Sequence, residues 1–236
     1  IVDQLNPLVP LFKIASADIT NLPLLKKIAK KKKPIILSTG ASNLSEIKYA
    51  INFLKRNGSK EIVILHCILS YPAKNENANL SMINSLKKEF PNNFIGYSDH
   101  TKPDRELNSI VTSYILGARV IEKHFTYNKK LKGNDHYHSM DKDDLRNVTK
   151  SLKIIKKLIG KSDKKKCIKV ENLSRKNARR SIYANSNILK GNKIKESDLI
   201  CKRPGKGLSP LKFYKIIGKK AKTNIQKDSL IKNNNY

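Results

Sequence analysis

Short apolar segments that end in small or polar residues alternate with helical patterns in the first part of the chain, and this alternation restricts the fold more than any other feature. The five segments are 11–16 (LFKIAS), 34–40 (PIILSTG), 61–67 (EIVILHC), 93–100 (NFIGYSDH) and 118–125 (ARVIEKHF). They are rich in Ile, Val and Leu and show no apolar/polar alternation, which is typical of strands buried on both faces of a parallel sheet.

Helical patterns separate these segments. Apolar residues recur at spacings of three and four in 22–31, 43–58, 79–90 and 106–117, and 140–160 predicts a last helix. Asn43 or Ser42 can cap the second helix, and Gly58 can end it. Strand and helix thus alternate as a series of right-handed βαβ units, and the fold class is α/β.

A doubly wound sheet and a (β/α)8 TIM barrel both use such units. No G-x-G-x-x-G or Walker loop follows a strand, so the nucleotide-binding form of the doubly wound sheet has no support. Polar residues instead gather at the carboxyl ends of the strands, where barrel enzymes keep their chemistry. They are Lys13, Ser16, Ser38, Thr39, His66, Ser98, Asp99, His100, Glu122 and His124.

Five βα units do not close an eight-stranded barrel, and an open sheet would leave two apolar edges unpaired. We therefore expect an incomplete TIM barrel that holds the last five βα units of a longer protein. The expected domains are the partial barrel at 1–160, a lysine-rich linker at 161–177 and a small β-rich domain at 178–236. Short helices are expected at IKESDL and LSPLKFYKIIG in the last domain.

The charge balance is strongly basic, with 49 Lys and Arg against 19 Asp and Glu and a net charge of +30. The lysines are spread along the whole chain, and aromatic residues make up only 6% of it, so the sequence lacks the stacking platforms of a nucleic-acid-binding protein. Three dispersed cysteines indicate neither a disulfide framework nor a zinc knuckle. With no long apolar run and no signal-peptide pattern, we expect a soluble cytoplasmic protein without nucleic-acid or membrane partners.

His100 and His124 follow consecutive predicted strands, so their imidazoles can converge on a divalent metal at a barrel mouth, although two histidines could equally be unrelated loop residues. Asp135, His136 and His138 lie in the later segment GNDHYHSM. An alternating His-x-His pair can bind metal, but a polar surface loop is the commoner interpretation. Lys13 is costly in a buried strand unless it meets an anion. Ser16, Ser38 and Ser98 can donate to the same anion, which indicates a pocket for a phosphorylated substrate.

Seven ordered motifs make the interpretation more specific. KIASADITNLPLL, PIILSTGASNLSEI, LHC followed by YP, GYSDHT, IEKHFT, GNDHYHSMD and KRPGKG occur in the order and approximate spacing found in the sialic acid synthase family. This family includes the N-acetylneuraminate, legionaminate and pseudaminate synthases. The chain resembles it over essentially its whole length, and the last domain resembles the antifreeze-like SAF domain.

The resemblance implies a transferase that condenses phosphoenolpyruvate with an N-acetylhexosamine, foremost N-acetylmannosamine, to give a nine-carbon 2-keto-3-deoxy acid and phosphate. Legionaminate or pseudaminate synthesis is the alternative within the family. The family uses a divalent metal, usually Mn2+, with Mg2+ or Co2+ also possible. The metal is held by histidines that match His100 and His124 and polarises the sugar aldehyde.

The remaining site residues also follow from the resemblance. Lys13, Ser16, Ser38 and Ser98 match positions that bind phosphoenolpyruvate, and Tyr71 and Asp135 match contacts to the amino sugar. Asp18 stands where many members have a glutamate near the sugar, and we expect it, with His100 and His124, to be catalytic. Arg203 resembles an arginine that reaches the barrel of a partner subunit, which implies a domain-swapped homodimer.

Several family residues lie on strands that this chain does not contain, so we expect the chain alone to be inactive. Two other classes remain open. One is an aldolase or isomerase that uses Lys13 as a Schiff-base nucleophile. The other is a basic module that binds nucleic acid or an anionic polysaccharide.

Overall fold

The computed structural model describes all 236 residues and divides them into two compact units, Ile1–Gly160 and Lys161–Tyr236. The elements of the first unit are α1 (Val2–Leu5), β1 (Phe12–Ile14), α2 (Leu22–Ala29), β2 (Ile35–Ser38), α3 (Leu44–Arg56), β3 (Ile62–Cys67), α4 (Met82–Glu89), β4 (Ile95–Asp99), α5 (Asn108–Leu116), β5 (Ile121–Lys123) and α6 (Lys142–Ile159). Those of the second unit are α7 (Asn172–Ala178), β6 (Ser181–Ala184), β7 (Leu199–Lys202) and α8 (Phe213–Ile216).

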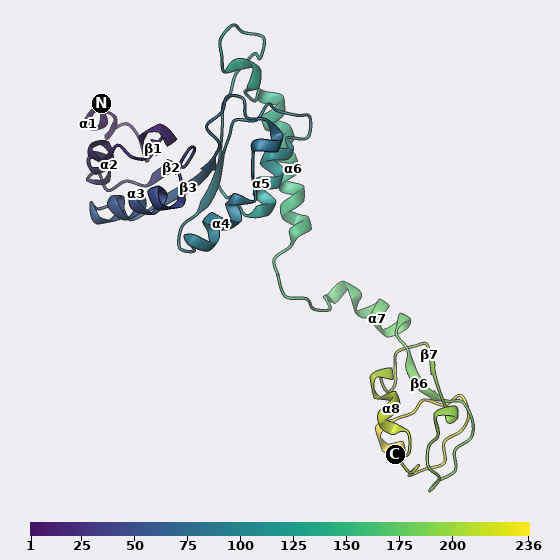
Figure 1. Ribbon diagram of the computed structural model, residues 1–236. Helices are drawn as coiled ribbons and strands as arrows, with labels where there is room; N and C mark the ends of the chain where they lie inside the picture. Colours follow the sequence, from purple (N-terminus) through teal and green to yellow (C-terminus); the bar gives the residue numbers. More distant parts are fainter. The chain divides into compact units, whose positions relative to one another are not determined.

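The first unit contains one five-stranded parallel sheet with the strand order β1-β2-β3-β4-β5 (Figure 1). Every strand pairs with the next one along the chain, and right-handed crossovers then place all the connecting helices on one face of the sheet. A doubly wound sheet reverses its order at a switch point and covers both faces, so the observed order excludes that alternative. The predicted α/β class and the five parallel strands are confirmed.

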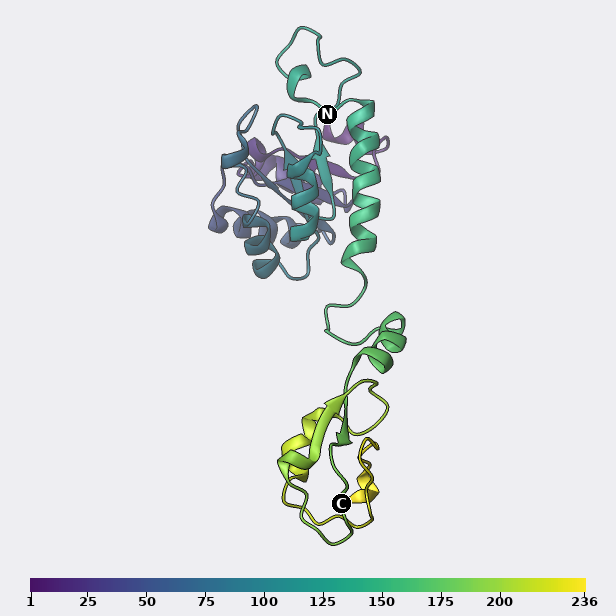
Figure 2. The same ribbon diagram turned by 90° about the vertical axis from the view of Figure 1, so that its right-hand side faces the viewer.

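The main core of this unit lies between the sheet and the helices that cover it. Ile14, Leu37 and Ile64 from the strands are fully buried against Leu25 of α2 and Ile51 of α3. A smaller core joins α5 to α6, which appears as the longest helix in Figure 2.

Capping residues determine where the long helices begin. Asn43 accepts a hydrogen bond from the amide of Glu46, and the Glu46 carboxylate accepts one from the amide of Asn43, so α3 begins with a capping box. Asp141 and Asp144 make the same reciprocal pair at the start of α6. Of the two capping residues that the sequence offers for α3, the structure uses Asn43.

The second unit has its own core around an antiparallel pair, β6 and β7. Ile182, Ile188, Ile216 and Ile231 are buried there. Helix α7 begins in the segment expected as a linker, 161–177, and ends one residue beyond it, and all residues of 161–180 are exposed. Short helical turns occur at Glu196–Asp198 and over 210–216, where the sequence predicts them.

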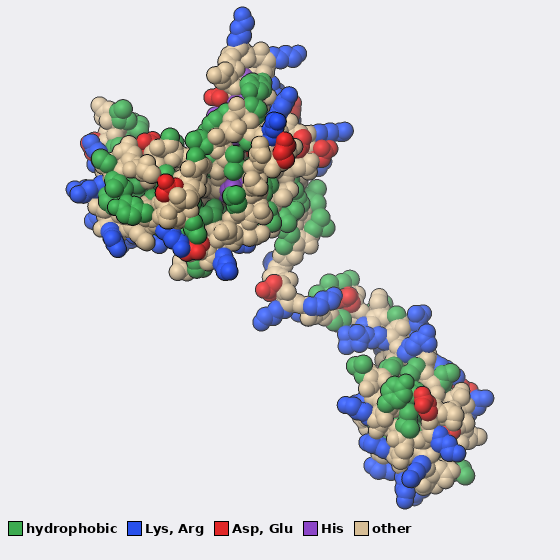
Figure 3. All heavy atoms as spheres, in the orientation of Figure 1, with side chains coloured by type: hydrophobic (Ala, Val, Ile, Leu, Met, Phe, Trp, Pro, Cys, Tyr) green, Lys and Arg blue, Asp and Glu red, His purple; other side chains and the backbone are tan.

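The surface of both units carries many lysines and arginines. On the face shown in Figure 3, the basic side chains are scattered over each unit among apolar and acidic ones rather than gathered into one stripe. None of the helices combines the length and apolar content that a membrane crossing requires.

Candidate active site

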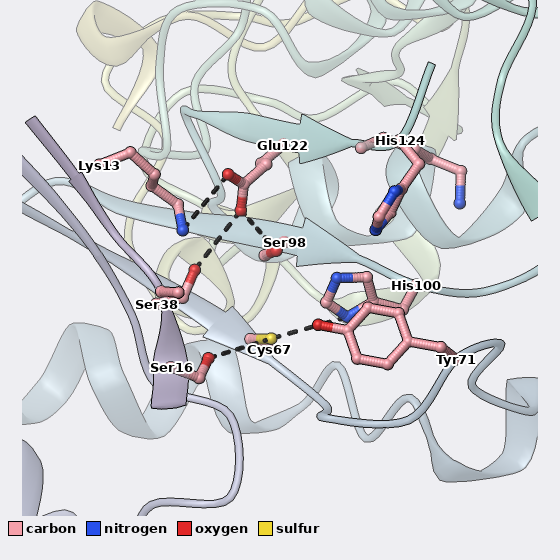
Figure 4. A pocket seen from close by; sticks show the side chains of 11 residues that line it. Lys13, Ser16, Ser38, Cys67, Tyr71, Ser98, His100, Glu122 and His124 are labelled. Atoms are coloured by element: carbon pink, nitrogen blue, oxygen red, sulfur yellow. Dashed lines mark hydrogen bonds and ion pairs between the residues drawn. The ribbon is translucent and has the colours of Figure 1, made fainter. Parts of the chain in front are cut away.

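A cavity of about 280 Å³ opens at the carboxyl ends of the five parallel strands (Figure 4). Its lining comes from every strand of the sheet or from the loop that follows it. The residues are Lys13, Ala15, Ser16, Ser38, Cys67, Tyr71, Ser98, His100, Glu122, Lys123 and His124. Of the ten residues predicted for the site, this cavity brings together Lys13, Ser16, Ser38, Tyr71, Ser98, His100 and His124.

The strand register explains why residues far apart in the sequence meet here. Ser98 of β4 pairs with Cys67 of β3 on one side and with Glu122 of β5 on the other. Residues paired across parallel strands point to the same face of a sheet, so these three side chains form a row. The row forms the floor of the cavity.

One half of the cavity is a set of donors around a carboxylate. Glu122 lies 3.3 Å from the Lys13 ammonium, and it accepts hydrogen bonds from the hydroxyls of Ser98 at 2.6 Å and Ser38 at 3.5 Å. Ser16 accepts a hydrogen bond from the amide of Gly40 at 2.8 Å. Three donors that converge on one carboxylate are the groups that bind a carboxylate or phosphate ligand.

The other half is a cluster of aromatic and imidazole rings. The ring centroids of His100 and His124 are 5.4 Å apart, and the Tyr71 ring lies 4.1 Å from His100 and 5.8 Å from His124. His138 lies 5.2 Å from His124, also measured between ring centroids. The loops after the strands therefore place three imidazoles and one phenol side by side.

A backbone carbonyl fixes the tautomer of His100. Its Nδ1 lies 3.0 Å from the Ile68 carbonyl oxygen, which can only accept, so Nδ1 donates and the lone pair is on Nε2. Burial lowers the pKa of His100 and therefore favours the neutral imidazole. A neutral ring held in this way by a second partner is typical of metal-ligating histidines.

The donor set fits a divalent cation. One ligand atom from each of His124, Asp135 and His138 lies within 4.8 Å of the others. Mixed imidazole nitrogens and a carboxylate oxygen suit Mn2+ and its neighbours among the transition metals. Cys67 lies near the Nδ1 atom of His100, with Sγ 3.8 Å from it, and thus away from the free Nε2 lone pair. Burial raises the pKa of the Cys67 thiol.

Beneath the rings lies a buried ion pair. Asp99 and Lys123 are 3.0 Å apart, and each side chain is only 1% exposed. Asp99 also accepts hydrogen bonds from the Tyr97 hydroxyl, the Ser109 hydroxyl and both the amide and hydroxyl of Thr101. Burial lowers the pKa of Lys123, although Asp99 opposes this shift. The pair anchors the two strand ends that carry His100 and His124.

The other predicted site residues lie outside the cavity lining. Asp18 is in the helical turn after β1, where its carboxylate accepts a hydrogen bond from the Asn21 amide group at 3.1 Å. Asp135 borders the imidazole cluster, 3.8 Å from the Nδ1 atom of His124. Arg203 lies exposed in the second unit, after β7.

The sequence placed Glu122 among the polar strand ends without a specific role, favoured a surface loop for His138, and pointed to neither Lys123 nor Cys67. All four belong to this region. Glu122 and Lys123 follow one another in β5, and alternation along a strand sends such neighbours to opposite faces. The cavity nevertheless touches both, because the strand ends there. The sequence did contain one signal for them, because Glu122 and Lys123 are two charged residues at the end of an otherwise apolar segment.

Comparisons with known proteins agree with this arrangement. The model of the NeuB family matches residues 1–164, and that of the SAF domain matches residues 179–236. The chain is 43% identical to the N,N'-diacetyllegionaminic acid synthase of Campylobacter jejuni over 234 residues, which are 98% of this chain and 69% of that protein. It is 32% identical to the N-acetylneuraminate-9-phosphate synthase of Drosophila melanogaster over an alignment of 251 positions, which covers 96% of this chain and 66% of that protein.

Among solved structures, the spore coat polysaccharide biosynthesis protein SpsE of Bacillus subtilis is similar, with a TM-score of 0.61 and 34% identity. The match covers 99% of this chain and 70% of that one. The chain thus spans about two thirds of the length of these relatives.

Proposed function

The chain belongs to the NeuB family, and from that premise we propose that its cavity serves the condensation of phosphoenolpyruvate with the aldehyde of an N-acetylated amino sugar. The products are a 2-keto-3-deoxy sugar acid and inorganic phosphate. One observation carries the proposal: a donor set built for an anion and a cluster of imidazoles lie in the same cavity.

The donor half is suited to phosphoenolpyruvate. Lys13, Ser38 and Ser98 already hold the carboxylate of Glu122, which occupies the place where a carboxylate or phosphate oxygen of the substrate would bind. Ser16 adds a third hydroxyl to the cavity lining. Since a second anion beside Glu122 is repelled, substrate binding requires the Glu122 side chain to turn away.

The imidazole half is suited to the sugar aldehyde. His100 and His124 would hold a divalent metal, foremost Mn2+ with Mg2+ or Co2+ as alternatives, which when bound would polarise the aldehyde oxygen. Tyr71 and Asp135 border this region and would contact the amino sugar. Carbon 3 of phosphoenolpyruvate then attacks the aldehyde carbon, water adds at carbon 2, and the carbon–oxygen bond to phosphate breaks.

Relatives bear on the choice of sugar. The identity to a diacetyllegionaminic acid synthase, 43%, exceeds that to an N-acetylneuraminate-9-phosphate synthase, 32%. The higher identity favours a diacetamido sugar as the acceptor, with N-acetylmannosamine as the alternative. Saturation-transfer NMR with each sugar, in the presence of phosphoenolpyruvate and Mn2+, would compare the two directly.

The proposal extends to the whole protein. A strand order of one to five with all helices on one face supports a (β/α)8 barrel. The family resemblance supports a homodimer in which Arg203 of one subunit serves the partner's cavity, with Asp18 near the sugar. Sedimentation of the chain as a monomer would contradict the dimer.

Binding of phosphoenolpyruvate tests the donor set. Lys13→Ala should weaken binding by roughly tenfold or more, because a charge-assisted contact is worth about 1.5–3 kcal/mol. Lys30→Ala, at an exposed position on the end of α2, is the matched control for the loss of one positive charge on this basic chain. Equal calorimetric affinities for the two variants would refute the proposed site.

Borohydride trapping with pyruvate separates the proposal from the Schiff-base alternative. Under the proposed function Lys13 binds anions, as it contacts Glu122 here, and is not labelled. Covalent labelling of Lys13 would instead indicate an aldolase or isomerase.

A further inference from the structure

We propose that His138 is a third imidazole ligand of the metal, supplied by the loop between β5 and α6. The inference rests on the proposed function, because it concerns the metal of the same site. It assigns a role to a residue that the sequence alone places in a polar surface loop.

His138 is buried and has no hydrogen-bond partner. Its side chain is 1% exposed, and neither Nδ1 nor Nε2 contacts a donor or acceptor within hydrogen-bond distance. A polar group buried in this way costs free energy, and the great majority of such groups in native proteins have a partner. The two orphaned nitrogens therefore indicate a missing partner of the folded protein.

The neighbours of His138 identify that partner as a cation. Nε2 of His138 lies 3.8 Å from one carboxylate oxygen of Asp135, and Nδ1 of His124 lies 3.8 Å from the other. These separations are too long for hydrogen bonds. They suit atoms that share a metal, because ligands at about 2.1 Å from a metal lie about 3–4 Å from one another.

The backbone positions His138 together with His124. The amide of Met140 donates to the carbonyl of His124 at 2.9 Å, and the amide of Thr126 donates to the carbonyl of Met140 at 2.8 Å. The Ser139 hydroxyl donates to the carbonyl of Asp135 at 2.6 Å, which closes the turn. The end of β5 and the loop are thus one hydrogen-bonded unit that presents both imidazoles.

His136 in the same loop shows the contrast. Its Nδ1 lies 2.8 Å from the Thr126 hydroxyl, so this ring already has a polar partner. It is also only partly buried. His136 is therefore the matched control for His138.

The third imidazole has a consequence for metal preference. Nitrogen ligands favour transition metals such as Co2+ and Zn2+, whereas Mg2+ prefers oxygen ligands. With His100, His124 and His138 the site should select Co2+ or Mn2+ strongly over Mg2+. Asp135 can bind the metal through one oxygen and keep the other for the sugar.

The test is a Co2+ titration of the 236-residue chain, followed by calorimetry and by the visible absorption of the bound ion. His138→Ala should weaken Co2+ binding by roughly tenfold or more, since even outer partners of metal ligands cost that much. His136→Ala should leave both the affinity and the spectrum unchanged. Pulsed EPR of bound Mn2+ should count one fewer coupled imidazole in His138→Ala than in the unsubstituted chain.

The outcomes separate the inference from the proposed function. If His124→Ala weakens Co2+ binding and His138→Ala does not, His138 is no ligand and the inference is overturned, while the proposed metal site stands. If the unsubstituted chain binds no Co2+ or Mn2+, both fail. Should circular dichroism show that His138→Ala is unfolded, His138→Phe fills the same space without a ligand atom and must show the same loss.

Discussion

Removal of the Asp99 carboxylate should destabilise the first unit more than any other single change near the site. Asp99→Ala leaves the Lys123 ammonium buried without its counter-ion, at a position where the side chain is 1% exposed. It also removes the acceptor of four further hydrogen bonds. Breaking a buried ion pair in this way typically costs about 3–5 kcal/mol.

Two comparison variants separate the charge from the hydrogen bonds. Tyr97→Phe removes one donor to the same carboxylate and should cost only about 1 kcal/mol. Asp99→Leu combined with Lys123→Met removes both charges and should recover much of the loss, because a buried pair replaced by apolar residues is often neutral in stability.

Hydrogen exchange measured by mass spectrometry suits this protein, because the chain contains two compact units and one unfolding curve would report on both of them together. Peptides from β4 and β5 should exchange faster in Asp99→Ala by the factor that corresponds to about 3–5 kcal/mol. Peptides from β6 and β7 serve as the internal reference and should not change. A loss below about 1 kcal/mol in β4 would refute the assignment of Asp99 as an anchor of the strand ends.

Two further predictions concern a buried histidine and a crowded glycine. Burial lowers the pKa of His66, whose Nε2 lies 2.8 Å from the Ala78 carbonyl. The unfolded chain, with a pKa of about 6.5, takes up the proton first, so stability should fall below about pH 6.5 by at most 1.4 kcal/mol per pH unit. His66→Gln should make this dependence shallower when β3 exchange is compared at pH 7 and pH 5.5, and identical slopes would contradict the prediction. A Cβ at Gly40 would lie 2.9 Å from the Ser16 hydroxyl and would displace it. Gly40→Ala should therefore weaken phosphoenolpyruvate binding in calorimetry and leave the Co2+ affinity intact. An unchanged phosphoenolpyruvate affinity would show that Ser16 does not contact the substrate.

The fold was predictable from sequence because parallel strands buried on both faces appear as short continuous apolar runs. The run at 61–67, for example, contains β3 at Ile62–Cys67, and the pattern at 43–58 contains α3 at Leu44–Arg56. The strand ends were less certain, because pairing with a neighbour and not local composition decides where a strand stops. Helix α7 lies in a segment whose lysines indicated only a solvated linker, and indeed none of it is buried.

The site was predictable only in part, because the strand register and the burial of loops depend on contacts between residues that are distant in sequence. Polar residues at strand ends identified Lys13, Ser98 and His124. The burial of His138 depends on a loop folded back over β5, which no local pattern encodes. Asp18 and Ser16 lie in the same helical turn after β1, yet only Ser16 lines the cavity.

Relaxation of the phosphorus nucleus of phosphoenolpyruvate tests most directly whether metal and substrate share this cavity. Bound Mn2+ should shorten the 31P relaxation time of phosphoenolpyruvate well beyond the effect of Mn2+ without protein, because the donor set and the imidazoles line one cavity. Lys13→Ala and His124→Ala should each reduce the protein-dependent part, the first by weakening the binding of the substrate and the second by weakening the binding of the metal. A 31P relaxation time that is the same with and without the protein, at concentrations where both ligands bind, would contradict the account.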